Sequence, residues 1–320
     1  MPSVLVTGAS GFIGSSLADE GLKRSYTVFA GIRKGSSRRW LSDPALNILE
    51  IDYSSQAGLT ASLKSISEQG IHFDYVIHNA GVTKTRDPRD FYRINRDLTT
   101  WFVRALKECG LFPKRFVYLS SLAASTHPPA GHYGRSKRET EGFLCTLESD
   151  DVVIFRVTGV YGPRDHDYLS IIKAIDSGLE VYIGTDQQIL SFIYIDDLVR
   201  LIFDSLEKKA NQRIYAVSDG SSVTATEFSA LLKSVLGRKN TVKIVFPLPV
   251  VRLAAWLNSA VSRMTGKAPV LNPDKVHILG VRDWSCSTAA IKDDFGFESS
   301  FRLEQGLQEA ISWYKHNGWL

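Results

Sequence analysis

The chain has 320 residues, 44% of them hydrophobic and 22% charged, so it can bury a sizeable core and suits one large domain with a smaller one. Its 38 Lys and Arg exceed its 34 Asp and Glu by only four charges, which argues against nucleic acid as a partner. The three widely spaced cysteines, Cys109, Cys145 and Cys286, form no metal-ligand pattern, which favours a reducing, cytoplasmic location and no bound metal. The first strand-like run follows Met1-Pro2-Ser3 directly, so we expect no secretory signal before it.

Three glycines, Gly8, Gly11 and Gly14, follow the first apolar run of the chain at intervals of three residues. This pattern predicts a strand, a tight turn and a helix. Gly8 permits the turn, Gly11 leaves room for a phosphate, and Gly14 lets the helix pack closely. A phosphate would then meet the unpaired amide groups at the positive end of the helix dipole. The alternative is an ordinary glycine-rich turn, because the first spacing is one residue longer than in GxGxxG.

A second buried strand is predicted over residues 26–32. Arg33 and Lys34 follow its carboxyl end, where the adenosine ribose of a dinucleotide is expected. Gly31 stands at the plausible position of an acidic residue that would bind the 2′-hydroxyl of NAD, whereas Arg33 could meet a 2′-phosphate. We therefore expect NADP as the cofactor, with NAD as the alternative. The competing interpretation is a solvated basic turn without any phosphate contact.

Four further apolar runs predict strands at 47–52, 75–81, 115–121 and 152–156. Helical segments separate these runs, which predicts parallel strands with crossover helices, a doubly wound (Rossmann) α/β sheet. Asp52 ends the third strand and either accepts a hydrogen bond from adenine or caps the next helix. Residues 91–105 predict a helix whose buried face carries Phe91, Ile94, Leu98, Phe102 and Ala105.

Prolines and shorter elements follow residue 162. We expect a dinucleotide-binding Rossmann domain over 1–162 and a smaller, mainly substrate-binding α/β domain over 163–320, from which residues 189–205 return to the first domain. The apolar stretch 242–261 is interrupted by charges and prolines, so it is not a membrane span. Residues 246–257 suit a helix with one apolar face, which either packs on its own domain or covers an apolar substrate; one Arg without a basic face supports membrane contact poorly. That face carries Val250, Leu253, Ala254 and Leu257.

Tyr133 and Lys137 lie four residues apart, a spacing that puts both on one helix face. A free phenol titrates near pH 10, and a nearby ammonium lowers that pKa, which makes tyrosine useful as an acid or base. Ser121 ends a predicted strand, where its hydroxyl can hold a substrate oxygen at hydride distance from a nicotinamide. Taken alone, a Tyr and a Lys at this spacing are common on helices.

Together with the glycine loop, these residues make the chain resemble the extended short-chain dehydrogenase/reductases, the NAD-dependent epimerase/dehydratase family. The resemblance spans nearly the whole chain, including Arg156, Tyr161-Gly162-Pro163 and Phe192-Ile193-Tyr194. It implies that catalysis falls to Asn95, Ser121, Tyr133 and Lys137. Besides Tyr133, Lys137 and Arg33, it implies these cofactor-binding residues: Gly8, Ser10, Gly11, Phe12, Ile13, Gly14, Asp52, Asn79, Ala80 and Gly81. The neighbouring His78 is interpreted as a packed residue near the cofactor. A homodimer is a common assembly in the resembled family.

Three departures from the family patterns bear on the substrate. Leu122-Ala123 stand where sugar dehydratases carry an Asp-Glu pair, so that chemistry lacks its extra acid and base. Gly159 and Leu190 stand where nucleotide-sugar epimerases typically place Asn and Arg. The segments 159–163 and 246–257 are instead similar to 3β-hydroxysteroid dehydrogenase-like members.

The sequence therefore favours an NAD(P)-dependent oxidoreductase that interconverts a secondary alcohol and a ketone on a hydrophobic or cyclic small molecule. The first alternative is a nucleotide-sugar epimerase with tightly bound NAD. The second is a non-catalytic dinucleotide-binding sensor, against which the complete set of Ser121, Tyr133 and Lys137 argues.

Overall fold

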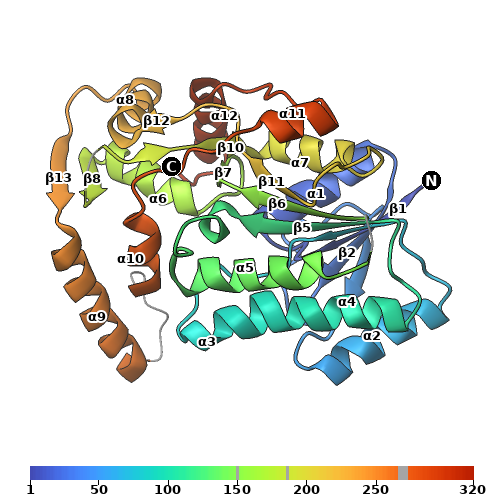
Figure 1. Cartoon of the computed structure of the whole chain (residues 1–320). Helices are drawn as coiled ribbons and strands as arrows, with labels where there is room; N and C mark the ends of the chain where they lie inside the picture. Colours follow the sequence, from blue (N-terminus) through green and yellow to red (C-terminus); the bar gives the residue numbers. More distant parts are fainter. Residues whose placement is uncertain (149–150, 185–186, 266–272) are drawn as a thin grey trace.

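A seven-stranded parallel sheet forms the centre of the molecule (Figure 1). The computed structural model describes residues 1–148, 151–184, 187–265 and 273–320. The strand order is β11-β6-β5-β4-β1-β2-β3, so the order reverses beside β1 and the predicted doubly wound sheet is confirmed. The strands are β1 (Ser3–Thr7), β2 (Thr27–Ile32), β3 (Asn47–Glu50), β4 (Tyr75–His78), β5 (Arg115–Ser121), β6 (Val152–Val157) and β11 (Ile214–Val217).

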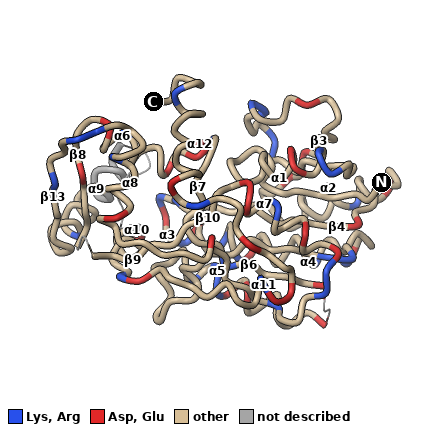
Figure 2. Tube along the Cα trace, turned by 90° about the horizontal axis from the view of Figure 1, so that it is seen from above, with Lys and Arg blue, Asp and Glu red and all other residues tan. Residues whose placement is uncertain are grey.

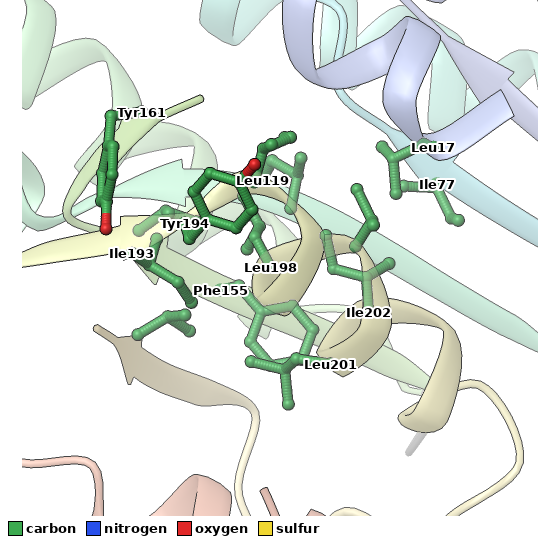
Figure 3. Packing of buried hydrophobic residues seen from close by; sticks show 14 of the residues in the cluster. Leu17, Ile77, Leu119, Phe155, Tyr161, Ile193, Tyr194, Leu198, Leu201 and Ile202 are labelled. Carbon is green, nitrogen blue, oxygen red and sulfur yellow. The ribbon is translucent and has the colours of Figure 1, made fainter. Parts of the chain in front are cut away.

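Helices cover both faces of this sheet (Figure 1). On one side lie α1 (Phe12–Lys23) and α7 (Ile195–Asp204), and on the other α2 (Gln56–Glu68), α4 (Leu98–Glu108) and α5 (Gly131–Cys145). Because alternate strand residues point to opposite faces, Val4 and Val6 belong to one buried cluster and Leu5 to another. Figure 3 shows the first cluster, in which Leu198 and Leu17 pack from the helices. Burial on both faces explains the continuously apolar strands.

The helix predicted over 91–105 is in fact interrupted. It consists of α3 (Pro88–Phe91), a π-helical segment (Tyr92–Asp97) and α4. A π-helix has a wider turn, so the buried face shifts: Asn95 is fully buried, while Ile94 is only half-buried. The predicted third strand also stops at Glu50 rather than at residue 52.

The segment 189–205 contains a strand and a helix with different partners. Helix α7 does pack on α1, whereas β10 (Phe192–Tyr194) pairs with β7 (Gly159–Tyr161) in a separate two-stranded sheet. The strand that joins the main sheet is β11, which pairs with β6.

The remaining elements form a smaller lobe and the C-terminal helices. The parallel pair β8 (Leu179–Ile183) and β13 (Val242–Phe246) and the antiparallel pair β9 (Ile189–Leu190) and β12 (Val223–Thr224) are its strands. Its helices and those of the C-terminus are α6 (Asp167–Asp176), α8 (Ala225–Leu236), α9 (Leu248–Thr265), α10 (Pro273–Leu279), α11 (Ala289–Phe295) and α12 (Leu303–His316). Acidic and basic residues are both spread over the tube in Figure 2.

Helix α9 does not turn its predicted apolar face inward. Val250, Leu253 and Leu257 are at least half exposed, while Val251 and Ala255 on the opposite side are buried. The interpretation that the predicted face packs on its own domain is therefore wrong. In the part of the chain that the structure describes, no helix has both the length and the apolarity of a membrane span.

Candidate active site

The glycine loop between β1 and α1 has the geometry that a phosphate needs. Gly8 has a φ of +66°, and a Cβ there would lie 3.0 Å from the backbone of Ala80. A Cβ on Gly14 would lie 2.1 Å from the carbonyl oxygen of Gly8, so only glycine lets α1 approach the turn. Beside Gly11 the nearest such atom is 3.5 Å away. The N-terminus of α1 has no side-chain cap, so its amide groups can bind an anion such as a dinucleotide pyrophosphate. Ser10, Phe12 and Ile13 complete this loop and first helical turn.

Thr7 connects this loop to the one after β4. Its Oγ1 accepts hydrogen bonds from the amides of Asn79 at 3.2 Å and Ala80 at 3.1 Å, and it lies 2.9 Å from Nδ1 of His78. The predicted phosphate loop and nicotinamide-side loop are thus brought into contact through side chains on neighbouring parallel strands.

His78 is completely buried, in agreement with its interpretation as a packed residue. Its Nε2 lies 3.0 Å from Oγ1 of Thr99, which itself donates to the carbonyl of Asn95 at 2.7 Å. Because Thr99 uses its proton there, it accepts from Nε2–H, and Nδ1 is left to accept from Thr7. Burial, with a smaller contribution from Lys137, lowers the pKa of His78 to about 3. The imidazole is therefore neutral and held in one tautomer.

Asn95 extends this buried network toward α5. Its Nδ2 donates to the carbonyl of Val82 at 3.1 Å and to Oγ of Ser136 at 3.0 Å, and its Oδ1 accepts from the amide of Val82 at 2.8 Å. A Cβ on Gly81 would lie 2.9 Å from Oδ1 of Asn95. The amide group of Asn95 thus fixes the loop that contains Gly81, and a catalytic role for Asn95 stays a prediction.

Ser121 and Tyr133 meet at the carboxyl edge of the sheet. Ser121 is the last residue of β5, and Tyr133 lies in the first turn of α5. Burial raises the pKa of Tyr133, and a hydrogen bond with the side chain of Ser121 opposes the rise. The direction is opposite to the lowering expected from Lys137, because loss of solvation outweighs the groups that favour the phenolate.

Lys137 lies one turn further along α5 and is 6% exposed. Its Nζ donates to the carbonyl of Leu119 at 2.8 Å and lies 4.7 Å from the centre of the Tyr118 ring. A Cβ on Gly81 would be 3.6 Å from Nζ, so the ammonium lies directly beside the nicotinamide-side loop. Burial lowers the pKa of Lys137 to about 8, and Glu141 opposes this shift.

Glu141 is a buried carboxylate one turn beyond Lys137. Its Oε1 accepts from Oγ of Ser120 at 2.6 Å, and its two oxygens accept from Arg156 at 3.0 and 2.7 Å. The ion pair with Arg156 offsets the free-energy cost of burying the Glu141 carboxylate. The negative charge of Glu141 also favours the charged form of Lys137.

Asp274 is a site residue that the sequence did not indicate. Helix α5 has no side-chain cap from its own N-terminal residues; instead, the carboxylate of Asp274 in α10 accepts hydrogen bonds from the amides of His132 and Tyr133. Gly131 has a φ of +65° and packs against this carboxylate. An acid at a helix N-terminus stabilises the helix dipole. The sequence could not indicate this cap, because 142 residues separate Asp274 from His132.

At the adenosine end, the structure corrects the reasoning about Gly31. This residue lies inside β2, and a Cβ would meet methyl groups of Leu5 and Ile51 at 3.2 and 3.3 Å, so the position faces the core rather than a ribose. Arg33 is the first residue after the strand and is exposed. Within the described ranges, its guanidinium has no hydrogen-bond or ion-pair partner, whereas that of Arg38 binds Glu50 at 2.8 Å.

Asp52 does not cap the following helix. Ser55 caps α2, with Oγ accepting from the amide of Gly58 at 3.0 Å. The exposed carboxylate of Asp52 accepts a hydrogen bond from the amide of Ser54. Hydrogen bonds with the side chain and the backbone of Ser54 lower the pKa of Asp52. The capping alternative is wrong, and the adenine contact stays a prediction.

At the three places where the sequence departs from the family patterns, the structure has apolar side chains or a neighbouring side chain that fills the space. Leu122 and Ala123 are buried in a short 3-10 helix. A Cβ on Gly159 would lie 2.0 Å from the phenol oxygen of Tyr168, so this tyrosine occupies the space beside Gly159. Leu190 lies in β9 and packs against the hydrophobic core. In the described residues, no group of His, Cys, Asp and Glu has the arrangement of a metal site.

Comparison with known proteins places these features in one family. The model of the NAD dependent epimerase/dehydratase family matches residues 4–218. The chain is 25% identical to a ceramide reductase of Caulobacter vibrioides (strain NA1000 / CB15N), over 99% of this chain and 96% of that protein. It is 28% identical to a UDP-glucose 4-epimerase of Vibrio cholerae, over 96% and 94% of the two chains.

Among solved structures, the chain is similar to the UDP-glucose 4-epimerase of Thermotoga maritima with UDP-glucose. The TM-score is 0.77 at 21% identity, and the alignment covers 98% of this chain and 99% of that one, which is a likeness of fold. The family model matches two thirds of the chain, and the matched residues include the glycine loop. The chain therefore belongs to the NAD dependent epimerase/dehydratase family, and it is an enzyme of this nicotinamide-dependent family.

Proposed function

We propose that the chain is an NAD(P)-dependent oxidoreductase that interconverts a secondary alcohol and a ketone on a hydrophobic or cyclic small molecule. The observation that carries this proposal is that Ser121 ends β5 near Tyr133 of α5, with Lys137 one helical turn away, at the carboxyl edge of the sheet. The proposal assigns residues 1–162 mainly to the cofactor and the smaller lobe to the substrate.

The proposed chemistry divides between three side chains. Ser121 donates a hydrogen bond to the substrate oxygen, and Tyr133 gives that oxygen a proton in reduction or removes the hydroxyl proton in oxidation. Lys137 binds the ribose and favours the phenolate when it forms. Nicotinamide, when bound, supplies or accepts the hydride at the same carbon. Because burial raises the pKa of Tyr133, the phenol predominates at neutral pH, which suits ketone reduction.

The nature of the substrate is inferred from the filled positions near the site. Tyr168 takes the space beside Gly159, and Leu190 is apolar, where nucleotide-sugar enzymes of the family use Asn and Arg. Two polar groups for a sugar diphosphate are therefore missing, whereas an aromatic and an aliphatic surface suit an apolar ligand. Similarity to a ceramide reductase over nearly the whole chain supports a hydrophobic substrate.

For the cofactor we propose NADP over NAD, bound by the glycine loop, Asp52, Asn79, Ala80 and Gly81. The exposed guanidinium of Arg33 follows β2 and is available to a 2′-phosphate. Arg33→Ala should weaken NADP binding by about 1–3 kcal/mol and leave NAD binding unchanged, measured by titration of protein fluorescence. Arg38→Ala is the matched control, since Arg38 already binds Glu50. Equal losses for both cofactors in Arg33→Ala would contradict the assignment.

A second candidate is a nucleotide-sugar epimerase, favoured by 28% identity to a UDP-glucose 4-epimerase. The discriminating experiment incubates the purified chain with NADPH or NADH and a panel of hydrophobic ketones, and separately with UDP-glucose. Net loss of reduced-nicotinamide absorbance with a hydrophobic ketone supports the proposal. Formation of an epimeric sugar without net cofactor change would replace it with the epimerase.

A further inference from the structure

Large exposed apolar side chains gather at one end of the molecule. Among the side chains that the structure describes, every such residue except Met1 lies in α6, β8, β13 or α9. Figure 1 shows β8, β13 and α9 together at the edge of the smaller lobe. Contiguous exposed apolar surface is uncommon on proteins that contact only water.

In the strand pair β8–β13, apolar side chains face solvent. Its register pairs Leu179 with Val242 and Val181 with Ile244. The intervening residues Glu180 and Tyr182 are buried, so the apolar pairs lie on the opposite, solvent-facing side. Val242 is 62% exposed. A strand pair normally buries its apolar side, whereas Leu179, Val181 and Val242 are exposed here.

Helix α9 continues this apolar surface from the end of β13. Val251 and Ala255 pack with Val276 of α10, while the other side of the helix is exposed among the residues that the structure describes. That side carries Leu253 and Trp256, which are 59% and 63% exposed. Both sides of this helical stretch are therefore apolar, which is unusual for a helix at a water-exposed edge. We name Leu179, Val181, Val242, Phe246, Leu253 and Trp256 the outer face.

The sequence segment that contains β13 and α9 carries only positive charges. Residues 228–273 contain no Asp or Glu and seven cations: Lys233, Arg238, Lys239, Lys243, Arg252 and Arg263, with Lys267. Lys233 and Arg238 bind carboxylates of neighbouring elements, whereas Lys239 and Arg252 are exposed beside the outer face. An isologous dimer through this face would bring the cationic segment against itself. An anionic lipid surface complements both its apolar side chains and its charge.

We propose that the outer face docks on the surface of an anionic lipid bilayer, with α9 and the β8–β13 pair lying in the interface. Trp256 and Leu253 enter the headgroup region, and Lys239 and Arg252 contact lipid phosphates. The docking is peripheral and reversible, and it does not depend on the identity of the substrate. Through α10, whose Asp274 caps the catalytic helix, the docked surface adjoins the active site.

The test is co-sedimentation of the full chain with vesicles, without substrate or cofactor. Vesicles of phosphatidylcholine alone are compared with vesicles of phosphatidylcholine and phosphatidylglycerol. We expect at least tenfold stronger binding to the anionic vesicles, a tenfold loss in Leu253→Gln/Trp256→Gln, and a salt-sensitive loss in Lys239→Gln/Arg252→Gln. The control Lys64→Gln/Lys315→Gln removes two exposed cations elsewhere and should bind like the wild type.

Two results would overturn the proposal. One is an absence of the expected binding: the anionic vesicles bind no protein, or they bind the wild type, the Leu253/Trp256 variant and the Lys239/Arg252 variant equally. The other is a dimer in sedimentation velocity that Leu253→Gln/Trp256→Gln converts to a monomer, which would assign the face to a second copy. Circular dichroism confirms that the variants fold. Since no turnover is measured, failure of the proposed oxidoreductase activity leaves the vesicle result interpretable.

Discussion

The buried network around His78 and the outer face of β8, β13 and α9 place side chains in opposite surroundings. In the network, Thr7, His78, Asn95 and Thr99 are polar and have no exposure, yet each has hydrogen-bond partners. On the outer face, large apolar side chains are exposed. Each arrangement costs free energy by itself. Both arrangements therefore point to function. The buried network would fix the geometry of the site, and the outer face would contact a partner outside the molecule.

The largest effect is expected at Tyr133, the proposed proton donor. Tyr133→Phe keeps the ring and removes the phenol hydroxyl near Ser121. Loss of a general acid should lower kcat by about 10²–10⁴-fold, with cofactor affinity nearly unchanged. Single-turnover assays and cofactor titration measure the two quantities. Retained activity in this variant would refute the role of Tyr133, whatever the substrate.

The network also predicts acid sensitivity. The pKa of His78 is lowered from 6.5 to about 3 by burial, so below pH 6.5 the unfolded chain binds a proton that the folded chain does not. The free energy of unfolding should then fall as the pH drops from 6.5 toward 3, by up to about 1.4 kcal/mol per pH unit from this group.

Urea unfolding at several pH values measures this slope. His78→Gln keeps a donor and an acceptor but does not titrate, so its slope should be smaller than that of the wild type. His72→Gln, at an exposed histidine of the same region, is the control and should leave the slope unchanged. An identical slope in His78→Gln would show that other groups cause the acid sensitivity.

Asp274 connects the two regions, since it lies in α10 and caps α5. Asp274→Ala should lower the free energy of unfolding by about 0.5–2 kcal/mol, as expected for a lost helix cap, and should reduce kcat because Tyr133 is in the capped turn. Asp274→Asn retains one acceptor oxygen and should lose less of both. Cofactor affinity is the control measurement. If the alanine variant matched the wild type in stability and kcat, the cap would have no role in positioning Tyr133.

The smallest effect is expected on the outer face. Leu253→Gln replaces an exposed side chain with few protein contacts, so the free energy of unfolding should change by no more than about 0.5 kcal/mol. The buried Ala255 of the same helix gives the contrast, because Ala255→Gln would force a polar side chain into the contact with α10. Thermal unfolding of both variants tests this. A large loss in Leu253→Gln would mean that the side chain is part of a core.

Local pattern was sufficient for much of the site. The glycine spacing predicted the turn before α1, and alternating apolar and helical segments predicted parallel strands with crossover helices. The i, i+4 spacing put Tyr133 and Lys137 on one helix, because helix geometry depends only on near neighbours. The expectation for Gly31 was wrong, because the neighbours of this residue, Leu5 and Ile51, come from other strands and segments that the local pattern does not reveal.

The sequence by itself thus indicated the parallel strands with crossover helices, the glycine loop and the shared helix of Tyr133 and Lys137, since each shows as a pattern of residues close together in the sequence. Only the tertiary structure decided the tautomer of His78, the π-helical segment that buries Asn95, the cap from Asp274 and the outward direction of the α9 face. These features depend on partners far apart in the chain, 71 residues for Thr7 and His78 and 142 for His132 and Asp274. Such pairs carry no shared periodicity, so they exist only once the sheet and its helices have assembled.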